Sequence, residues 1–133
     1  MKINKVQPLS KALFINSKRR TLSLPYNEIT VAACDKPYIR IESISGKRFH
    51  IEMTLKDFVA ILPPCFAQFD RSRIVNLCHV SEIHNTNKGC ELLINDIPMR
   101  ISKRRKALVQ DLFLRIKRET GGETNCSTGC SLC

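Results

Sequence analysis

The stretch "LKDFVAILPPCFAQFDRSRIVNLCHVSEIH", residues 55–84, decides the fold, because the spacing of apolar residues changes within it. Its first part repeats apolar residues at helical spacing, at Leu55, Phe58, Val59 and Leu62. Thr54 and Asp57 form a capping box before this part, and Pro63–Pro64 follow it. The pattern predicts a short helix over about 54–62, and then strands at "CFAQF", "RIVNL" and "VSEIH".

Strand patterns continue on both sides of this stretch. Upstream, "TLSLP", "EITVAAC", "YIRIESI" and "RFHIEM" alternate apolar and polar residues from about Thr21 onward, which is typical of half-buried antiparallel strands. Downstream, "CELLI" and "PMRI" flank a turn at Asn95–Asp96. A last apolar stripe predicts a C-terminal helix over about 103–118. The predicted fold class is mostly β, with two helices.

The length of 133 residues fits one compact domain with short extensions. We predict an N-terminal extension over 1–20, the domain over 21–118 and a flexible tail over 119–133. The tail contains three cysteines with the spacing C-x3-C-x2-C: Cys126, Cys130 and Cys133. Three thiolates are one ligand short of a closed zinc site, and a tail of this kind offers no surrounding shell to orient them. A loose tail is therefore the preferred interpretation, zinc binding and redox cross-linking stay as alternatives, and no metal or cofactor is predicted.

The net charge is +10, from 22 lysines and arginines against 12 acidic residues. A surplus of this size favours a polyanionic partner: nucleic acid first, an anionic membrane surface second, with plain solubility as the alternative. The charge is also uneven, because residues 100–118 contain eight basic residues and one acid. Four of the eight fall at the start of the predicted last helix, where the helix dipole disfavours cations: Lys103, Arg104, Arg105 and Lys106. A bound phosphate explains this placement, with Ser102 as N-cap or as a further hydroxyl donor, and a plain solvated face is the alternative.

Two other basic groups lie where predicted strands meet. Lys36 and Tyr38 belong to "CDKPYIR", and Arg71 and Arg73 belong to "FDRSR". Arginine pairs bidentately with guanine, so Arg71 is a candidate base reader. The alternative for Arg71 is a surface ion pair with Asp70.

No apolar run approaches the roughly 18 residues that cross a bilayer, and "ALFI" is too short for the core of a signal peptide. We therefore expect a cytoplasmic protein without membrane insertion, in which the seven cysteines are reduced. Four of them are expected to be small buried apolar residues: Cys34, Cys65, Cys78 and Cys90. No catalytic constellation stands out, so the chain is not predicted to be an enzyme.

The quoted stretch resembles the LytTR family of bacterial DNA-binding domains. That family has a short helix ending in Leu-Pro, and then Phe-x-x-x-His-Arg-Ser-x-Ile-Val-Asn-x-x-x-Ile. This chain matches it at Leu62–Pro63, Phe66, Arg71–Ser72, Ile74–Val75–Asn76 and Val80. The similarity extends in order from about Leu24 to Leu114, and includes Ile29, Tyr38 and "MRISKRRKAL". The chain departs from the family at Asp70, where a histidine is usual, and at Ala32 or Ala33, where a glutamate is common.

The resemblance implies a stack of three short antiparallel β-sheets with small helices at the side. It also implies that loops enter successive major grooves of double-stranded DNA, often at direct repeats read by two copies. Carried over by position, it implies base contacts from Lys36, Pro37, Tyr38, Asp70, Arg71, Ser102 and Lys103. Phosphate contacts are implied for Arg73, Arg104, Arg105 and Lys106.

The function predicted on this basis is a sequence-specific transcription regulator, comparable to the effector domain of a bacterial response regulator. We expect it to stand alone and to be controlled by a protein partner, by its own abundance, or not at all. The alternative is a protein-interaction module or anti-regulator whose basic face binds an acidic protein. RNA binding ranks third, because the chain lacks strands with the aromatic residues that stack on bases.

Overall fold

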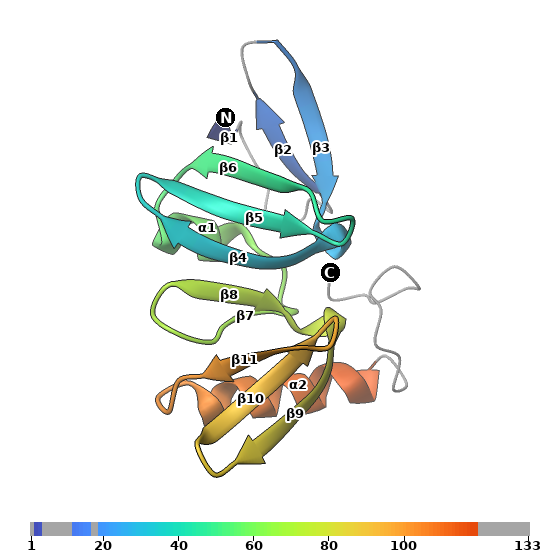
Figure 1. Cartoon of the computed structure of the whole chain (residues 1–133). Helices are drawn as coiled ribbons and strands as arrows, with labels where there is room; N and C mark the ends of the chain where they lie inside the picture. The colour runs from blue at the N-terminus through green and yellow to red at the C-terminus, as the bar shows by residue number, and fades with distance from the viewer. Residues whose placement is uncertain (1, 4–11, 17–18, 120–133) are drawn as a thin grey trace.

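The computed structural model describes residues 2–3, 12–16 and 19–119 of the chain, and these form three antiparallel sheets with two helices (Figure 1). The first sheet has the order β1-β2-β3. Its strands are β1 (Lys2–Ile3), β2 (Ala12–Asn16) and β3 (Thr21–Pro25). A 3-10 turn, η1 (Tyr26–Glu28), leads from β3 into the central sheet.

The central sheet has five strands in the order β6-β5-β4-β8-β7. They are β4 (Ile29–Asp35), β5 (Tyr38–Ser43), β6 (Arg48–Glu52), β7 (Phe66–Gln68) and β8 (Arg73–Asn76). The meander β4-β5-β6 joins the hairpin β7-β8 through β4 and β8, which pair with Ala32 opposite Ile74. The first two of the three strands predicted in the quoted stretch therefore complete the sheet that the upstream strands begin.

The third sheet has the order β11-β10-β9 and packs against the C-terminal helix α2 (Lys106–Glu119). Its strands are β9 (Val80–Thr86), β10 (Gly89–Ile94) and β11 (Ile97–Ile101), and a second 3-10 turn, η2 (Leu77–His79), precedes β9. The predicted turn at Asn95–Asp96 is confirmed, since both residues have positive φ angles of 51° and 62°.

Apolar residues form two clusters, one on each face of the central sheet. Val31 and Val75 belong to the cluster with α2 and the third sheet. Their chain neighbours Ala32 and Ile74 belong to the cluster with α1 (Leu55–Ile61) and the first sheet. Alternating residues of a strand point to opposite faces, so both faces of the central sheet are buried. The predicted stack of three sheets is confirmed.

The short helix α1 begins as predicted. The Asp57 N–H donates to the Thr54 hydroxyl at 3.1 Å, and the helix ends at Ile61, before the two prolines. The predicted start of α2 is wrong by three residues. Residues 102–105 form a turn in which the Arg105 N–H donates to the Ser102 carbonyl at 3.1 Å. Ser102 is therefore not the N-cap of the helix, and three of the four cations lie before its first turn, where the dipole opposes them less.

Two further expectations change. Residues before position 21 contribute to the core, because Leu13 and Ile15 of β2 are buried against the central sheet. Cys65 and Cys78 each form a disulfide, so the expectation of reduced cysteines is wrong for these two. Sequence spacing does not show which sulfur atoms meet in the folded chain. Cys90 is a buried free thiol and Cys34 is a half-buried one.

The predicted tail with Cys126, Cys130 and Cys133 lies outside the described residues. Among the residues that are described, no helix is long and apolar enough to cross a membrane.

Candidate nucleic-acid interface

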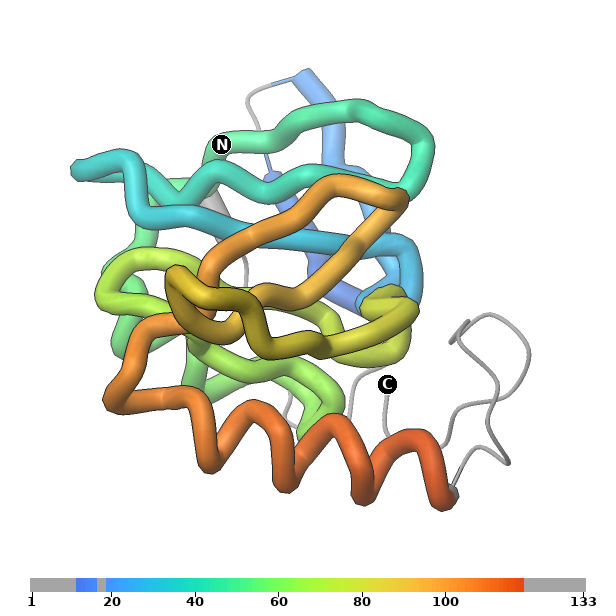
Figure 2. Tube along the Cα trace, turned by 60° about the horizontal axis from the view of Figure 1, so that its bottom comes forward, coloured from blue at the N-terminus to red at the C-terminus, as the bar shows by residue number. Residues whose placement is uncertain are grey.

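Three loops lie in a row along one side of the molecule, and they contain the candidate DNA contacts. They are the β4-β5 turn (residues 36–38), the β7-β8 loop (69–73) and the turn before α2 (102–105). Figures 1 and 2 show them on the same side in two views. We call these three segments the loop edge.

Main-chain hydrogen bonds join the middle segment to the turn before α2 and to the end of β4, just before the β4-β5 turn. The Cys34 N–H, at the end of β4, donates to the Ser72 carbonyl at 2.8 Å, and the Ser102 N–H donates to the Phe69 carbonyl at 2.9 Å. The middle segment is thus bonded to a neighbour on each side. The two bonded pairs are 38 and 33 residues apart in the sequence, so the fold brings together segments that the sequence separates.

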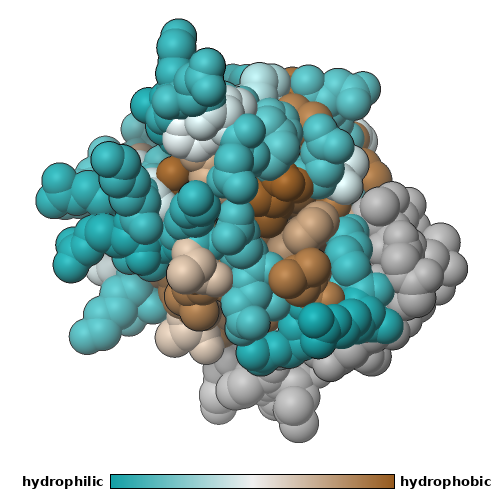
Figure 3. Space-filling view, turned by 90° about the horizontal axis from the view of Figure 1, so that it is seen from below, coloured by the Kyte–Doolittle hydropathy of each residue, from teal (hydrophilic) through white to brown (hydrophobic). Residues whose placement is uncertain are grey.

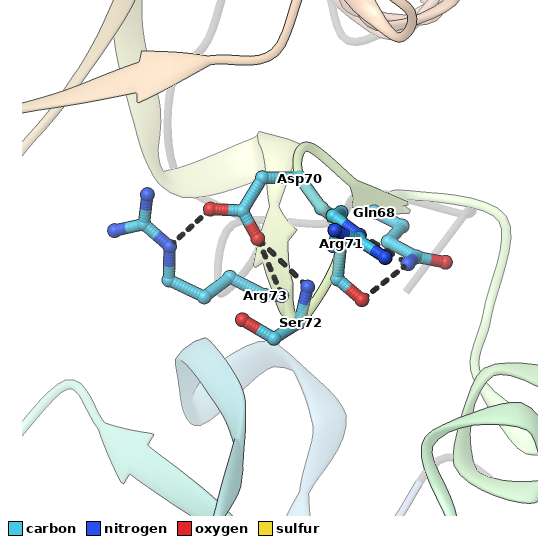
Figure 4. A network of polar contacts seen from close by, with 5 residues as sticks. All are labelled: Gln68, Asp70, Arg71, Ser72 and Arg73. Carbon is cyan, nitrogen blue, oxygen red and sulfur yellow. Dashed lines mark hydrogen bonds and ion pairs between the residues drawn. The ribbon is translucent and has the colours of Figure 1, made fainter.

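Asp70 organises the middle segment (Figure 4). Its Oδ1 accepts hydrogen bonds from the N–H groups of Ser72 and Arg73, at 2.9 and 2.8 Å. Its Oδ2 accepts a bond of 2.6 Å from the Arg73 Nε. Gln68 adds a second brace, because its side-chain amide donates to the carbonyls of Asp70 and Arg71 at 3.0 and 3.3 Å. The loop is consequently held by side chains on both sides of Arg71.

These contacts set the charge state of Asp70. Partial burial raises the pKa of its carboxyl, but the hydrogen bonds from Ser72 and Arg73 and the positive charge of Arg73 outweigh burial. The net result is a pKa below the ordinary value of 3.8. Asp70 is therefore a carboxylate at neutral pH, and its charge is matched by an adjacent cation.

The two arginines of this loop differ in their contacts. Arg73 pairs with Asp70, and its guanidinium lies over the Phe69 ring, 4.8 Å from the centroid. Arg71 is exposed and has no ion-pair partner among the residues that the structure describes. The predicted alternative for Arg71, an ion pair with Asp70, is thus wrong, because the carboxylate points to Arg73.

The outer segments of the loop edge are also exposed. In the β4-β5 turn, Lys36 and Pro37 are exposed, and Tyr38 packs edge-to-face on His50 with ring centroids 6.3 Å apart. In the turn before α2, Lys103 and Arg104 are exposed, as is Lys106 at the start of the helix, whereas Ser102 and Arg105 are half-buried. From below, hydrophilic side chains project along the side of the molecule where Figure 1 shows the loop edge (Figure 3).

Three residues near this surface were not predicted from the sequence. Gln68 braces the middle loop and Phe69 supports Arg73. Arg40 lies beside Arg73 in a small hollow, because Ala33 of β4 pairs with Arg40 on one side and with Arg73 on the other. Alternation in "YIRIE" already places Arg40 on the face of the strand away from the buried Ile39 and Ile41. Only the strand order shows that Arg73 lies on the same face of the sheet, on the other side of Ala33.

Comparison with known proteins gives a consistent result. A family model described as the LytTr DNA-binding domain matches residues 19–119. Among solved structures, the fold is similar to the LytTr DNA-binding domain of a protein named as a methyl-accepting/DNA response regulator from Bacillus cereus. The TM-score is 0.65 at 16% sequence identity, and the likeness covers 77% of this chain and 96% of that chain. No curated protein sequence matches the chain.

Proposed function

Since this chain belongs to the LytTR family of DNA-binding domains, it is a DNA-binding regulator, and we propose that it recognises specific double-stranded sequences through the loop edge. The observation that carries the proposal is the pair of main-chain bonds that holds the middle segment between the turn before α2 and the end of β4, from which the β4-β5 turn extends. A row of loops is suited to successive major grooves, where base pairs present distinct donor and acceptor patterns.

We assign the base contacts to side chains of each segment, all of them exposed except the half-buried Ser102. Arg71 stands at the centre of the row with its guanidinium unpaired among the described residues, which favours bidentate contact with guanine. Lys36, Pro37 and Tyr38 are proposed to contact bases on one side of it, and Ser102 and Lys103 on the other. For Asp70 we propose a supporting role, because both of its carboxylate oxygens already accept hydrogen bonds within the loop.

The phosphate contacts are proposed to come from cations at the margins of the same surface. Arg73 uses its Nε for Asp70, which leaves its two terminal amino groups for a phosphate. Arg104, Arg105 and Lys106 surround the start of α2. Such contacts fix the register of the protein on the duplex without reading sequence. Two copies bound to a direct repeat are the expected arrangement on a full site.

The deciding experiment is a selection of genomic DNA fragments with the purified protein. We expect a common motif to be enriched, with two half-sites in the same orientation. Recovery of fragments without a common motif would contradict sequence-specific binding. It would favour the alternative function, a module whose basic face binds an acidic protein, because salt dependence alone does not separate these two functions.

The base-reading role of Arg71 has its own test. Arg71→Ala should weaken binding to the selected site about 10-fold or more and leave binding to a scrambled duplex almost unchanged, because it removes a base contact. Arg73→Ala should weaken both, because it removes a phosphate contact. Arg48→Ala is the matched control, since Arg48 is exposed at the other end of the central sheet and paired with Glu42. Equal ratios of specific to non-specific affinity in wild type and Arg71→Ala would end the assignment.

A further inference from the structure

A hollow of about 770 Å³ opens beside the loop edge. The β4-β5 turn, the end of β6, the start of α1 and the middle segment of the loop edge supply its walls. Its apolar side chains come mainly from Pro37, Tyr38, Met53 and Leu55. This volume is within the range of small-molecule sites, and an apolar lining with few polar groups is their usual composition. A surface used only for phosphates needs no such lining.

The charges of the hollow are divided between its two sides. Lys36 and Arg71 line it on the side of the loop edge, and neither side chain has an ion-pair partner in the part of the chain that the structure describes. The two acids of the lining, Glu52 and Asp57, come from the end of β6 and from α1. A ligand with its negative group toward the loop edge therefore meets two unpaired cations, and its body lies against Met53 and Leu55.

We infer that this hollow binds a small organic anion with an apolar body, and that the bound anion excludes DNA. Binding of the anion is inferred from the lining and the charges of the hollow alone. Exclusion of DNA rests on the proposed function, because Lys36, Tyr38 and Arg71 of this hollow are also assigned to base contacts. Such a ligand gives the regulator a chemical signal that acts directly at its recognition surface.

The site is tested first without DNA, using 2-naphthoate as the probe. Titration into the ¹⁵N-labelled full chain should give saturable amide shifts centred on residues 34–38, 53–57 and 71–72. The cation 2-naphthylmethylammonium has a comparable apolar body and should bind several-fold more weakly, and acetate should produce no saturable shifts. Shifts centred elsewhere, no saturation with naphthoate, or tighter binding of the cation would each overturn the site.

Charge reversal tests the two cations. The double variant Lys36→Glu/Arg71→Glu should weaken naphthoate binding about 10-fold, because two exposed attractions become repulsions. Both residues are exposed, so folding should be retained, and the amide spectrum checks this. Lys47→Glu is the matched control, because Lys47 is an exposed lysine that lines a second hollow of about 290 Å³. Equal loss in both variants would contradict the assignment.

Exclusion of DNA is tested separately, with the duplex obtained from the selection. Saturating naphthoate should raise the dissociation constant of that duplex at least several-fold, and the duplex should in turn displace naphthoate. An unchanged dissociation constant would overturn the exclusion while leaving the binding site in place. If the selection yields no specific duplex, the proposed function fails, but the amide shifts and charge reversal still decide whether the hollow binds the anion.

Discussion

Asn76 shows how much of this fold depends on one polar side chain. It is fully buried, and its amide donates to the Ile29 carbonyl at 3.1 Å and to the Tyr26 carbonyl at 3.4 Å. Its Oδ1 accepts from the Cys78 N–H at 3.1 Å. The residue thus bonds the turns before β4 and after β8 to each other. It belongs to the Ile-Val-Asn motif that identifies the family, and its role in the motif is structural.

Asn76→Ala should lower the free energy of unfolding by about 2–3 kcal/mol, because it leaves buried backbone groups without partners. Urea denaturation measures the change, and Asn85→Ala, an exposed asparagine on β9, serves as control. A loss below about 1 kcal/mol would mean that water or a rearranged turn replaces these bonds.

Asp70 should make the stability depend on acid. Its folded pKa lies below the unfolded value, so its contribution is present above about pH 4 and is lost as pH falls through the folded pKa. Asp70→Asn should therefore destabilise the protein by about 1 kcal/mol near neutral pH, and the difference should shrink on acidification.

Denaturation curves between pH 2 and 7 check this behaviour. Asp111→Asn is the control, because that carboxylate forms an exposed pair with Arg115 on α2. A difference between wild type and Asp70→Asn that stays constant with pH would show that the ion pair does not stabilise the loop.

At the scale of elements, apolar spacing predicted most strands and both helices, because it reflects which face is buried. Apolar spacing failed at strand β2, which is short, and at the start of α2, which follows a run of basic residues. Strand β2 has one alternation, with Leu13 and Ile15 buried and Phe14 exposed, and five residues are too few to distinguish from a loop. The start of α2 was predicted too early because residues 102–105 contain no glycine or proline that would separate them from the helix in the sequence, and only the Arg105–Ser102 bond shows that they form a turn.

The contact between η2 and α2 should be sensitive to pH through His79. Burial lowers the pKa of His79 and nearby Lys117 lowers it further, while the bond to the Asn27 carbonyl opposes them. The unfolded chain therefore binds the proton more readily. Stability should be complete above about pH 6.5 and should fall as pH drops below that value, until the folded pKa is passed.

His79→Gln should reduce the dependence of stability on pH in this range. The measurement is the midpoint of thermal unfolding between pH 5.5 and 7.5. His50→Gln should keep it, since His50 is about half exposed. If both variants retain the same slope, another group is responsible for it.

At the scale of the whole molecule, the uneven positive charge predicted a polyanionic partner, and the resemblance to the LytTR family implied a DNA-binding domain of three sheets. The candidate residues fall in three separate groups of the sequence, and the resemblance implied that these groups act together on DNA without showing which residues adjoin. That depends on β8 pairing with β4, which brings residues 72 and 34 within hydrogen-bonding distance. The partner of Asp70 could not be predicted either, because Arg71 and Arg73 are both near it in the sequence and only the loop conformation selects Arg73.

The charge of the loop edge should determine how DNA affinity responds to salt. Each phosphate contact contributes about 0.9 to the slope of log affinity against log salt, so Arg104→Ala/Arg105→Ala should reduce that slope by about 2. The control is Lys47→Ala/Arg48→Ala, two exposed cations at the opposite end of the central sheet. Titration of the selected duplex at four salt concentrations gives both slopes, and equal reductions would place the phosphate contacts elsewhere.

The bonds that hold the loop edge together come from main-chain atoms of Cys34, Ser72, Phe69 and Ser102. Peptide groups are the same whatever side chain is attached, so this framework tolerates exchange at the exposed positions between them. Lys36, Arg71 and Lys103 can be randomised as a combinatorial library while the scaffold stays constant. Variants that recognise new operators can then be selected by changing these three residues only, while Asp70, Gln68 and Asn76 are kept.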